Sequence, residues 1–273
     1  MIKNVLVTFI IYNIFKFEYY KKNAINKLWN MREVTQFNLN YQVKVEQNNK
    51  IDLSNQKFFS FVNPNFKNKY KDFIKLLNNY NIYLKDKEEY TENELNEIDL
   101  FLENVLKSES GKYMIDIIKF LKSINTKKEI KEYLFEIWFE IYDRKSNKVL
   151  DSCGFEHVFI GELYSKSQPG KLGGYHNWIK FYLDEEKGLT EYYGYLIDSN
   201  LNIATIQLSH QEVFKKIGGF FLGIDPYTEF CIFTVAFISR GKFSIFNVDN
   251  KKIKIVTYPY YDKYISTAFP KLI

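Results

Sequence analysis

Residues 152–178 read SCGFEHVFIGELYSKSQPGKLGGYHNW and contain two of the three histidines in the chain. His157 lies in a short apolar run, and His176 follows the pair Gly173-Gly174. The Gly- and Pro-containing segment between them predicts a loop, so we expect two imidazoles on strands that face each other. Because imidazole titrates near neutrality, such a pair can hold one neutral and one protonated ring. The pattern indicates a proton-transfer site; the alternative is two partly buried histidines without a chemical role.

The composition is that of a folded protein. Hydrophobic residues make up 46% and charged residues 26% of the 273 positions, which excludes an intrinsically disordered chain. The net charge of +5 is mild, so it permits a polyanionic ligand without requiring one. Cys153 and Cys231 lack the spacing of a metal cluster, which argues against structural zinc. A disulfide between them stays open, and with it the redox compartment.

The N-terminus contains an apolar run over residues 5–15, about the length of a signal-peptide core. Asn13 interrupts this run and no small-residue cleavage site follows, so residues 1–22 are either a signal segment or a first buried element. The run is too short to cross a membrane as a helix, and we expect no stable membrane span. The protein is expected to be secreted if residues 1–20 are a signal peptide, and cytoplasmic otherwise.

The part of the chain before residue 145 has the periodicity of helices. Thr91 and Thr126 each precede a glutamate by three residues, which predicts two capping boxes ahead of amphipathic helices. After residue 145 the apolar period shortens to about two and glycine becomes frequent. We therefore expect an α+β fold, with a mainly helical N-terminal lobe over residues 23–145 and a mainly antiparallel-β catalytic lobe over residues 146–273, together one domain.

Eight segments of the second lobe have the apolar content and the flanking turn residues of strands. They are Phe155–Ile160, Trp178–Leu183, Tyr192–Ile197, Ile203–Leu208, Phe220–Ile224, Phe230–Ile238, Phe243–Val248 and Lys252–Tyr258. The last two flank Asp249-Asn250-Lys251, which predicts a hairpin turn.

A second polar segment, residues 214–223, reads FKKIGGFFLG and places Lys215 and Lys216 ahead of a Gly pair. A lysine at this position can meet an anion in a cleft, where glycine lets the backbone come close. Two histidines and a lysine suffice to cut RNA without a metal. One imidazole removes the 2′-hydroxyl proton, the other protonates the departing 5′-oxygen, and the cation stabilises charge at phosphorus. The alternative is a pair of solvated surface lysines.

Five segments taken together are distinctive: GFEHVFIGE, GYHNWIKFYLDEEKG, YYGY, KKIGGFFLGIDPYTEF and STAFP. They resemble the EndoU family of uridylate-preferring endoribonucleases, whose catalytic core the coronaviral uridylate-specific endoribonuclease shares. The resemblance extends from about Asn23 to Pro270 and includes KLWN and FEIWFEIYDR upstream. The EHVF and HNW boxes are the most specific parts.

The resemblance implies catalytic roles for His157, His176 and Lys215. It implies that His176 is the base toward the 2′-hydroxyl, His157 the acid, and Lys215 the electrostatic stabiliser. Glu156 and Glu162 are implied in or beside the site. In a strand, Glu156 would point away from His157, so we expect it to orient the chain. We expect Glu162 to position a histidine or help bind a metal.

Some positions depart from the family pattern. Gly219 stands where the family commonly has a serine that meets the uracil edge, and Phe269 stands where it has a tyrosine. A phenyl ring can stack on a pyrimidine but donates no hydrogen bond, so the strictness of uridine selection stays open. Thr257 and Thr267 are candidate polar contacts to the substrate. His210 matches no family position, and we expect it at the surface or in an auxiliary role.

The implied activity is cleavage of single-stranded RNA at uridylates by transesterification, which leaves a 2′,3′-cyclic phosphate and a 5′-hydroxyl. The family implies stimulation by Mn²⁺, or by Ca²⁺, through RNA binding or conformation rather than through the chemical step. We expect no action on DNA and a monomeric protein. Two alternatives stay open: an RNA-binding protein with weak or lost catalysis, and a secreted nuclease toxin or host-interaction factor with the same core.

Overall fold

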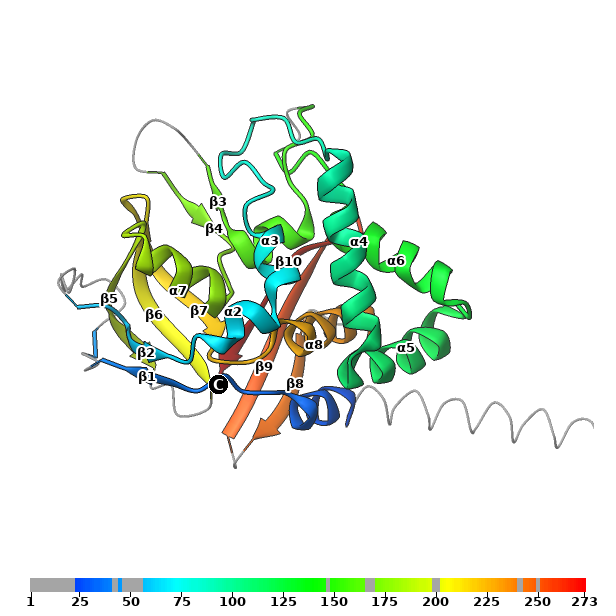
Figure 1. Cartoon of the computed structure of the whole chain (residues 1–273), viewed down its shortest axis with the longest axis horizontal. Helices are drawn as coiled ribbons and strands as arrows, with labels where there is room; N and C mark the ends of the chain where they lie inside the picture. The colour runs from blue at the N-terminus through cyan, green and yellow to red at the C-terminus, as the bar shows by residue number, and fades with distance from the viewer. Residues whose placement is uncertain are drawn as a thin grey trace, which may run out of the picture.

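The helices of residues 92–139 lie on one side of the molecule and the antiparallel sheet of residues 190–221 lies on the other, as Figure 1 shows for this computed structural model. The structure describes residues 23–40, 44–45, 56–145, 148–164, 170–197, 202–239, 243–248 and 251–273. The predicted α+β class is confirmed. The predicted signal segment, residues 1–22, and the turn at residues 249–250 lie outside the described residues, and the lobe boundary at residue 145 stays a prediction.

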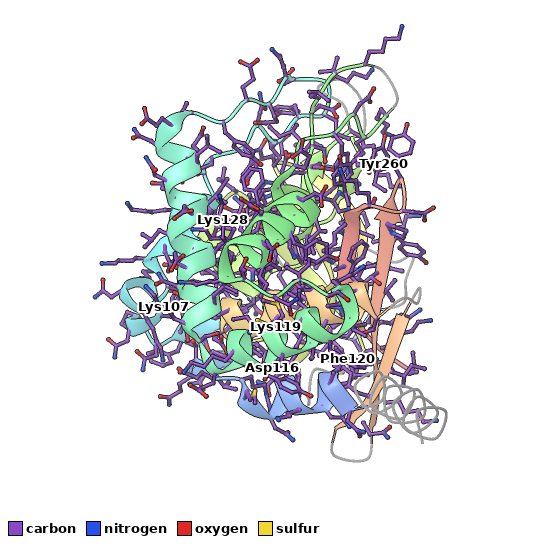
Figure 2. All side chains as sticks on the ribbon, turned by 90° about the vertical axis from the view of Figure 1, so that its right-hand side faces the viewer. Lys107, Asp116, Lys119, Phe120, Lys128 and Tyr260 are labelled. Atoms are coloured by element: carbon purple, nitrogen blue, oxygen red, sulfur yellow. The ribbon has the colours of Figure 1, made fainter. Side chains whose placement is uncertain are left out.

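The helical side is built from amphipathic helices with defined starts. Its elements after the helix at residues 23–31 are α2 (Asn65–Lys69), α3 (Lys71–Leu76), α4 (Glu92–Lys107), α5 (Glu109–Lys122) and α6 (Lys127–Phe139). Both predicted capping boxes are confirmed, at Thr91 before α4 and at Thr126 before α6. Figure 2 looks onto the face formed by α4, α5 and α6, whose exposed lysines include Lys107, Lys119 and Lys128.

The sheets are antiparallel, as predicted. One has the strand order β5-β6-β7, from β5 (Thr190–Ile197), β6 (Ile203–His210) and β7 (Val213–Phe221). Another has the order β10-β9-β8, from β8 (Phe243–Val248), β9 (Lys251–Tyr260) and β10 (Tyr264–Leu272). Two short pairs complete the strands, β1 (Phe37–Leu39) with β2 (Phe59–Val62), and β3 (Glu162–Leu163) with β4 (Leu172–Gly173).

Three of the predicted strands are wrong, because the segments are helical. Phe155–Ile160 contains the π-helix η1 (Glu156–Ile160), Trp178–Leu183 lies in α7 (Trp178–Glu186), and Phe230–Ile238 lies in α8 (Pro226–Ile238). The first and third are buried on nearly every side, so their apolar runs lack the polar face that separates a surface helix from a strand, and α7 is exposed only at Glu186. The strand predicted at Phe220–Ile224 exists, but it begins at Val213 and ends at Phe221.

The aromatic core fixes η1 between the helices and the sheets. Phe155 stacks on Phe139 of α6 at 4.9 Å between ring centroids. Trp138 of α6 stacks on Phe230 of α8 at 4.8 Å. Phe159 on η1 contacts Trp138 at 5.6 Å, so the three helices share one layer of rings.

The tryptophans and cysteines belong to the core. All three tryptophans are buried, and the indole of Trp178 donates to the carbonyl of Ile224 at 2.7 Å. Cys153 and Cys231 are both buried free thiols, so they form no disulfide. Within the ranges that the structure describes, no helix is both long enough and apolar enough to span a bilayer.

Candidate active site

His157 lies within the π-helix η1 rather than on a strand. Its amide donates to the carbonyl of Cys153, and the amide of Gly161 donates to that of Glu156 at 2.9 Å. Gly161 ends the helix with φ +87°, a conformation that favours glycine. Single π-helical turns widen the helix and are frequent at functional sites. The side chain is 8% exposed, so the ring is mostly buried.

The loop before α7 joins the second histidine to the first through the backbone. The amide of Tyr175 donates to the carbonyl of His157 at 3.0 Å, and the amide of His176 donates to that of Val158 at 2.7 Å. Gly174 has φ +62°, and a Cβ there would lie 1.6 Å from the His157 carbonyl oxygen. This close approach requires glycine, so the Gly pair in the sequence brings the two histidines together.

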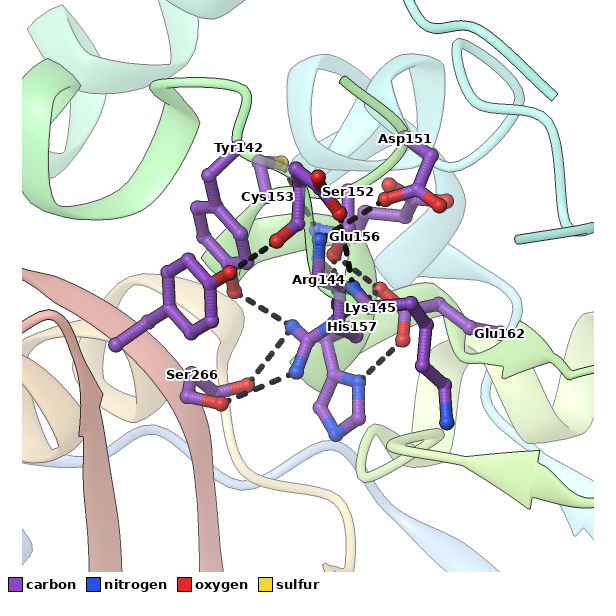
Figure 3. Close-up of polar contacts among 12 residues, drawn as sticks. Tyr142, Arg144, Lys145, Asp151, Ser152, Cys153, Glu156, His157, Glu162 and Ser266 are labelled. Carbon is purple, nitrogen blue, oxygen red and sulfur yellow. Dashed lines mark hydrogen bonds and ion pairs between the residues drawn. The ribbon is translucent and has the colours of Figure 1, made fainter. Parts of the chain in front are cut away.

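A buried carboxylate fixes the tautomer of His157. Its Nδ1 atom lies 2.6 Å from Oε2 of Glu162, which is fully buried. A carboxylate only accepts hydrogen bonds, so Nδ1 carries a proton and Nε2 remains for the chemistry. Figure 3 shows the other ring nitrogen of His157 directed away from this network. Glu162 therefore has the positioning geometry expected of it from the sequence.

Arg144 holds Glu162 in turn. Its Nε atom lies 3.0 Å from Oε1 of Glu162 and 2.8 Å from the hydroxyl of Ser152, which also donates to Glu162. Its other nitrogens donate to Ser266 of β10 at 3.1 and 3.0 Å and to Tyr142 at 2.6 Å (Figure 3). These charge-assisted contacts tie the last strand to the site.

Arg144 and Ser152 were not predicted as site residues. No local pattern links Arg144 to Glu162, because the two are eighteen positions apart and meet only in the folded chain. A conserved spacing between an arginine and the EHVF box across many sequences is the signal that could have found it.

His176 is held by the backbone of β7 and by an aromatic ring. Its Nδ1 atom lies 2.7 Å from the carbonyl oxygen of Gly219, which can only accept, so Nε2 is free to accept a proton. The ring of Phe269 stacks on the imidazole at 4.8 Å between centroids and 21° between planes. Gly219 and Phe269, predicted as substrate contacts, therefore both touch His176 itself.

Lys215 completes the group from β7. Its Nζ donates to the carbonyl of Gly174, in the loop that carries His176. Burial, together with the charge of Lys171, lowers the pKa of Lys215 to about 7. Lys216 is exposed and the next residue along the strand, so it points to the other face. The structure brings Lys215, and not Lys216, to the two histidines.

Burial governs the charge of both imidazoles. It lowers the pKa of His157 to about 4, with a further contribution from Arg144 that the carboxylate of Glu162 opposes. It also lowers the pKa of His176 well below the usual value, and Lys215 adds to this effect. In the protein without RNA, both rings are therefore neutral at pH 7. Although burial raises it, the pKa of Glu162 is held below its ordinary value by His157 and Arg144.

Glu156 lies in the core beneath the site. It is 1% exposed, and neither carboxylate oxygen has a hydrogen-bond partner among the described residues. Burial, with a contribution from the charge of Glu162, raises its pKa well above the usual value. It is not exposed to a phosphate, which fits the predicted role of orienting the chain, although the strand geometry used to infer that role is wrong.

The two threonines predicted as substrate contacts lie on different faces of their sheet. Ala268 pairs with Thr257, whereas Thr267 and Phe269 are its neighbours along β10. Side chains alternate along a strand, so Thr267 shares the face of Phe269 and Thr257 shares the opposite, buried face. The register therefore favours Thr267 over Thr257 as a contact.

The third histidine is buried, so its predicted surface position is wrong. His210 is 1% exposed and shares a hydrogen bond of 2.8 Å with the hydroxyl of Thr190. Its ring lies 4.8 Å from that of Tyr175, in the loop that carries His176. His210 thus packs, from the core side, against the loop that carries His176.

No metal centre accompanies these groups in the described part of the chain. No cluster of three or more His, Cys, Asp or Glu side chains there could hold an ion. Glu162 already binds Arg144 and His157, so its oxygens have other partners. The described side chains therefore do not fit the metal-binding role that the sequence suggested for Glu162.

Comparisons with known proteins identify the family of this chain. A family model described as Endoribonuclease XendoU matches residues 21–270. Human uridylate-specific endoribonuclease is 33% identical over 238 residues, which cover 82% of this chain and 57% of that protein, so the chain spans little more than half of that relative. Poly(U)-specific endoribonuclease-B of Xenopus laevis is 32% identical over 246 residues, 85% of this chain and 82% of that protein.

A solved structure of XendoU, described as a splicing independent snoRNA processing endoribonuclease, has the same fold. It is 28% identical and superposes with a TM-score of 0.75 over 93% of this chain and 97% of that chain. The family model covers far more than half of the sequence, including every residue of the site. The chain therefore belongs to the XendoU endoribonuclease family.

Proposed function

We propose that the protein cleaves single-stranded RNA, preferentially at uridylates, by transesterification and leaves a 2′,3′-cyclic phosphate and a 5′-hydroxyl. The observation that carries this proposal is the arrangement of two imidazoles with fixed tautomers and one half-buried lysine around the same loop. The names of the relatives, which refer to uridylate and poly(U), support the choice of base.

The reaction needs a base, an acid and a cation. Nε2 of His176 accepts the proton of the 2′-hydroxyl, and the 2′-oxygen attacks phosphorus. The bond from phosphorus to the 5′-oxygen breaks, and that oxygen takes a proton from Nε2 of His157. Lys215 balances the negative charge that builds on the phosphoryl oxygens.

The contacts of each histidine suit its role. Base chemistry needs a neutral ring with a free Nε2, and His176 has this form because the Gly219 carbonyl fixes its Nδ1 proton. Acid chemistry needs a protonated ring, and the carboxylate of Glu162 stabilises the imidazolium of His157. A phosphodiester that enters the site adds negative charge and raises the pKa of His157 and Lys215, so RNA favours the charged forms of both.

We also propose that Mn²⁺ or Ca²⁺ stimulates cleavage through RNA binding or conformation, that DNA is not cut and that the protein acts as a monomer. DNA lacks the attacking 2′-hydroxyl, so its resistance follows from the mechanism. A stimulated rate with unchanged pH dependence would support an indirect role of the ion.

The test uses a labelled oligonucleotide with one uridine and a matched one with 2′-deoxyuridine, each with and without Mn²⁺. Wild-type protein should cut the first and leave the second intact. His157→Ala, His176→Ala and Lys215→Ala should abolish cleavage, whereas Lys216→Ala, a control one residue away, should keep it. Cleavage of the deoxy substrate would exclude transesterification, and binding without cleavage by wild type would favour an RNA-binding protein that has lost catalysis.

A further inference from the structure

Two lysines are arranged around the ring of Tyr164, beside His157 but outside the catalytic contacts. Nζ of Lys145 lies 4.1 Å from the centroid of the Tyr164 ring, and Nζ of Lys171 lies 5.6 Å from it. Both lysines are exposed, whereas Tyr164 is half-buried. An aromatic ring attracts ammonium groups, so it can hold two cations close together that would otherwise repel each other.

The backbone fixes one lysine of this group. Leu163 of β3 pairs with Leu172 of β4, and just beyond this pair the amide of Tyr164 donates to the carbonyl of Lys171 at 3.1 Å. Tyr164 and Lys171 are therefore cross-strand neighbours. Lys145 comes from another segment, directly after Arg144, so the group is assembled by the fold rather than by one loop.

The lysine group adjoins the catalytic residues. A Cβ on Gly173 would lie 3.0 Å from the hydroxyl oxygen of Tyr164 and 3.0 Å from Cε1 of His157, so the two rings flank one small space. The charge of Lys171 reaches Lys215, whose pKa it lowers in addition to burial. In Figure 3 the ammonium of Lys145 and the imidazole of His157 extend to the same side of the network.

We propose that Lys145 and Lys171, held by Tyr164, form a second phosphate-binding subsite for the RNA phosphate on the 3′ side of the leaving nucleotide. The inference rests on the proposed ribonuclease function. There, His157 protonates the leaving 5′-oxygen, so the RNA beyond that oxygen passes the His157 side of the site. An ammonium group binds phosphate as a compact point charge with three donors.

The opposite side of the site has a different character, which supports this polarity. His176 packs against the ring of Phe269 and the carbonyl of Gly219, and neither offers a positive charge to a phosphate. Lys215 lies near both histidines; among the described residues, Lys145 and Lys171 add positive charge on the His157 side, and Phe269 adds an apolar ring on the His176 side. We therefore expect positive charge to hold the RNA on the leaving-group side and an aromatic ring to contact the RNA on the side of His176.

The experiment compares UpA, pUpA and UpAp, which differ only in a terminal phosphate. Wild-type protein should cleave UpAp with a kcat/KM about tenfold above that of UpA, since charge-assisted contacts of this kind contribute on the order of a factor of ten. The ratio of kcat/KM for UpAp to kcat/KM for UpA should fall below about two in the double variant Lys145→Gln/Lys171→Gln. Tyr164→Leu should lose most of the preference for UpAp. Tyr164→Phe, which keeps the aromatic ring, should retain this preference.

Lys128→Gln provides the matched control for charge. Its side chain is 85% exposed at the start of α6, on the helical face in Figure 2. It should leave the ratio at the wild-type value. A ratio near one in wild type, or an unchanged ratio in the double variant, would overturn the subsite. An advantage for pUpA that the double variant removes would overturn its placement on the leaving side.

Binding of the 2′-deoxyuridine analogues, measured by calorimetry, separates this inference from the proposed function. The analogue with a 3′-phosphate should bind about tenfold more tightly than the one without it, and the double variant should remove the difference. If wild type cleaves no RNA and this difference persists, the ribonuclease proposal fails but the subsite stands. If RNA is cleaved and the difference is absent, the subsite fails alone.

Discussion

The carbonyl oxygen of Gly219 lies 2.7 Å from Nδ1 of His176, and this single contact decides which ring nitrogen can accept a proton. Gly219 contacts His176 through its backbone carbonyl, although the family resemblance implies that a side chain at this position contacts the uracil. The contact that positions His176 and the substrate contact expected from the family resemblance thus fall on one residue of β7. A side chain added at this residue tests the second role without removing the first.

Gly219→Ser should fold. It should raise the preference for uridine over cytidine by about tenfold in kcat/KM, because the serine hydroxyl adds a hydrogen bond to the uracil. A Cβ at this position would lie 3.2 Å from the carbonyl oxygen of Pro270, so the strand must shift by a few tenths of an ångström. Competition between uridine and cytidine substrates measures the preference. Gly219→Ala adds the Cβ without the hydroxyl, and an equal gain in that variant would contradict the explanation.

Gly174→Ala should separate the loop that carries His176 from the π-helix η1. Its Cβ would lie 1.6 Å from the carbonyl oxygen of His157, so the loop must move and cleavage should fall at least ~100-fold. Gly188→Ala is the control, because Gly188 has a similar φ of +72° but open space around its Cβ. That variant should cost only about 1 kcal/mol in urea unfolding and keep its activity. Equal losses in both variants would refute the close-approach argument.

Glu162→Gln should reduce kcat by about 100-fold or more, because His157 loses the carboxylate that favours its protonated form. It should also lower the free energy of unfolding by about 3 kcal/mol, since the buried guanidinium of Arg144 loses its charged partner. Single-turnover kinetics and urea unfolding measure the two effects.

Glu186→Gln makes the same chemical change in an exposed ion pair with Lys57. Its effect on stability should stay below about 1 kcal/mol, with no effect on kcat. A normal kcat in Glu162→Gln would show that His157 needs no carboxylate.

Acidification should destabilise the protein through His210. Burial lowers the pKa of His210 to about 4 from its usual 6.5, so between these values the unfolded chain binds a proton that the native chain does not. Stability is then lost as the pH falls through this window, by about 2 kcal/mol for this residue at pH 5. Urea unfolding at pH 7.5 and pH 5 should show a smaller difference in His210→Gln than in wild type. An equal difference would mean that His210 already titrates normally in the folded protein.

The sequence located the residues of the candidate site better than it predicted the local backbone around them. The motifs identify His157, His176 and Lys215, and the structure gathers all three around one loop. The strand at Phe155–Ile160 is wrong because a short, fully buried apolar run has no period that separates helix from strand. For α8 a signal was present, since Asp225 caps the helix and Pro226 occupies its first turn.

The supporting contacts could not be predicted from one sequence. Arg144 reaches Glu162 and Ser266, which lie on segments far apart in the chain. Nothing in the residues around Arg144 distinguishes it from a surface arginine at the end of a helix. Such contacts depend on tertiary distances, which local spacing does not encode.

The position of β10 has a consequence for synthesis of the protein. This strand, Tyr264–Leu272, supplies Ser266 to Arg144 and Phe269 to His176, and it comes last among the described strands. A ribosome therefore makes both histidines and Lys215 long before the residues that complete their surroundings. Until β10 has left the exit tunnel, the growing chain carries the catalytic groups without their support. The order of the strands thus separates synthesis of the candidate catalytic side chains from synthesis of the residues that position them.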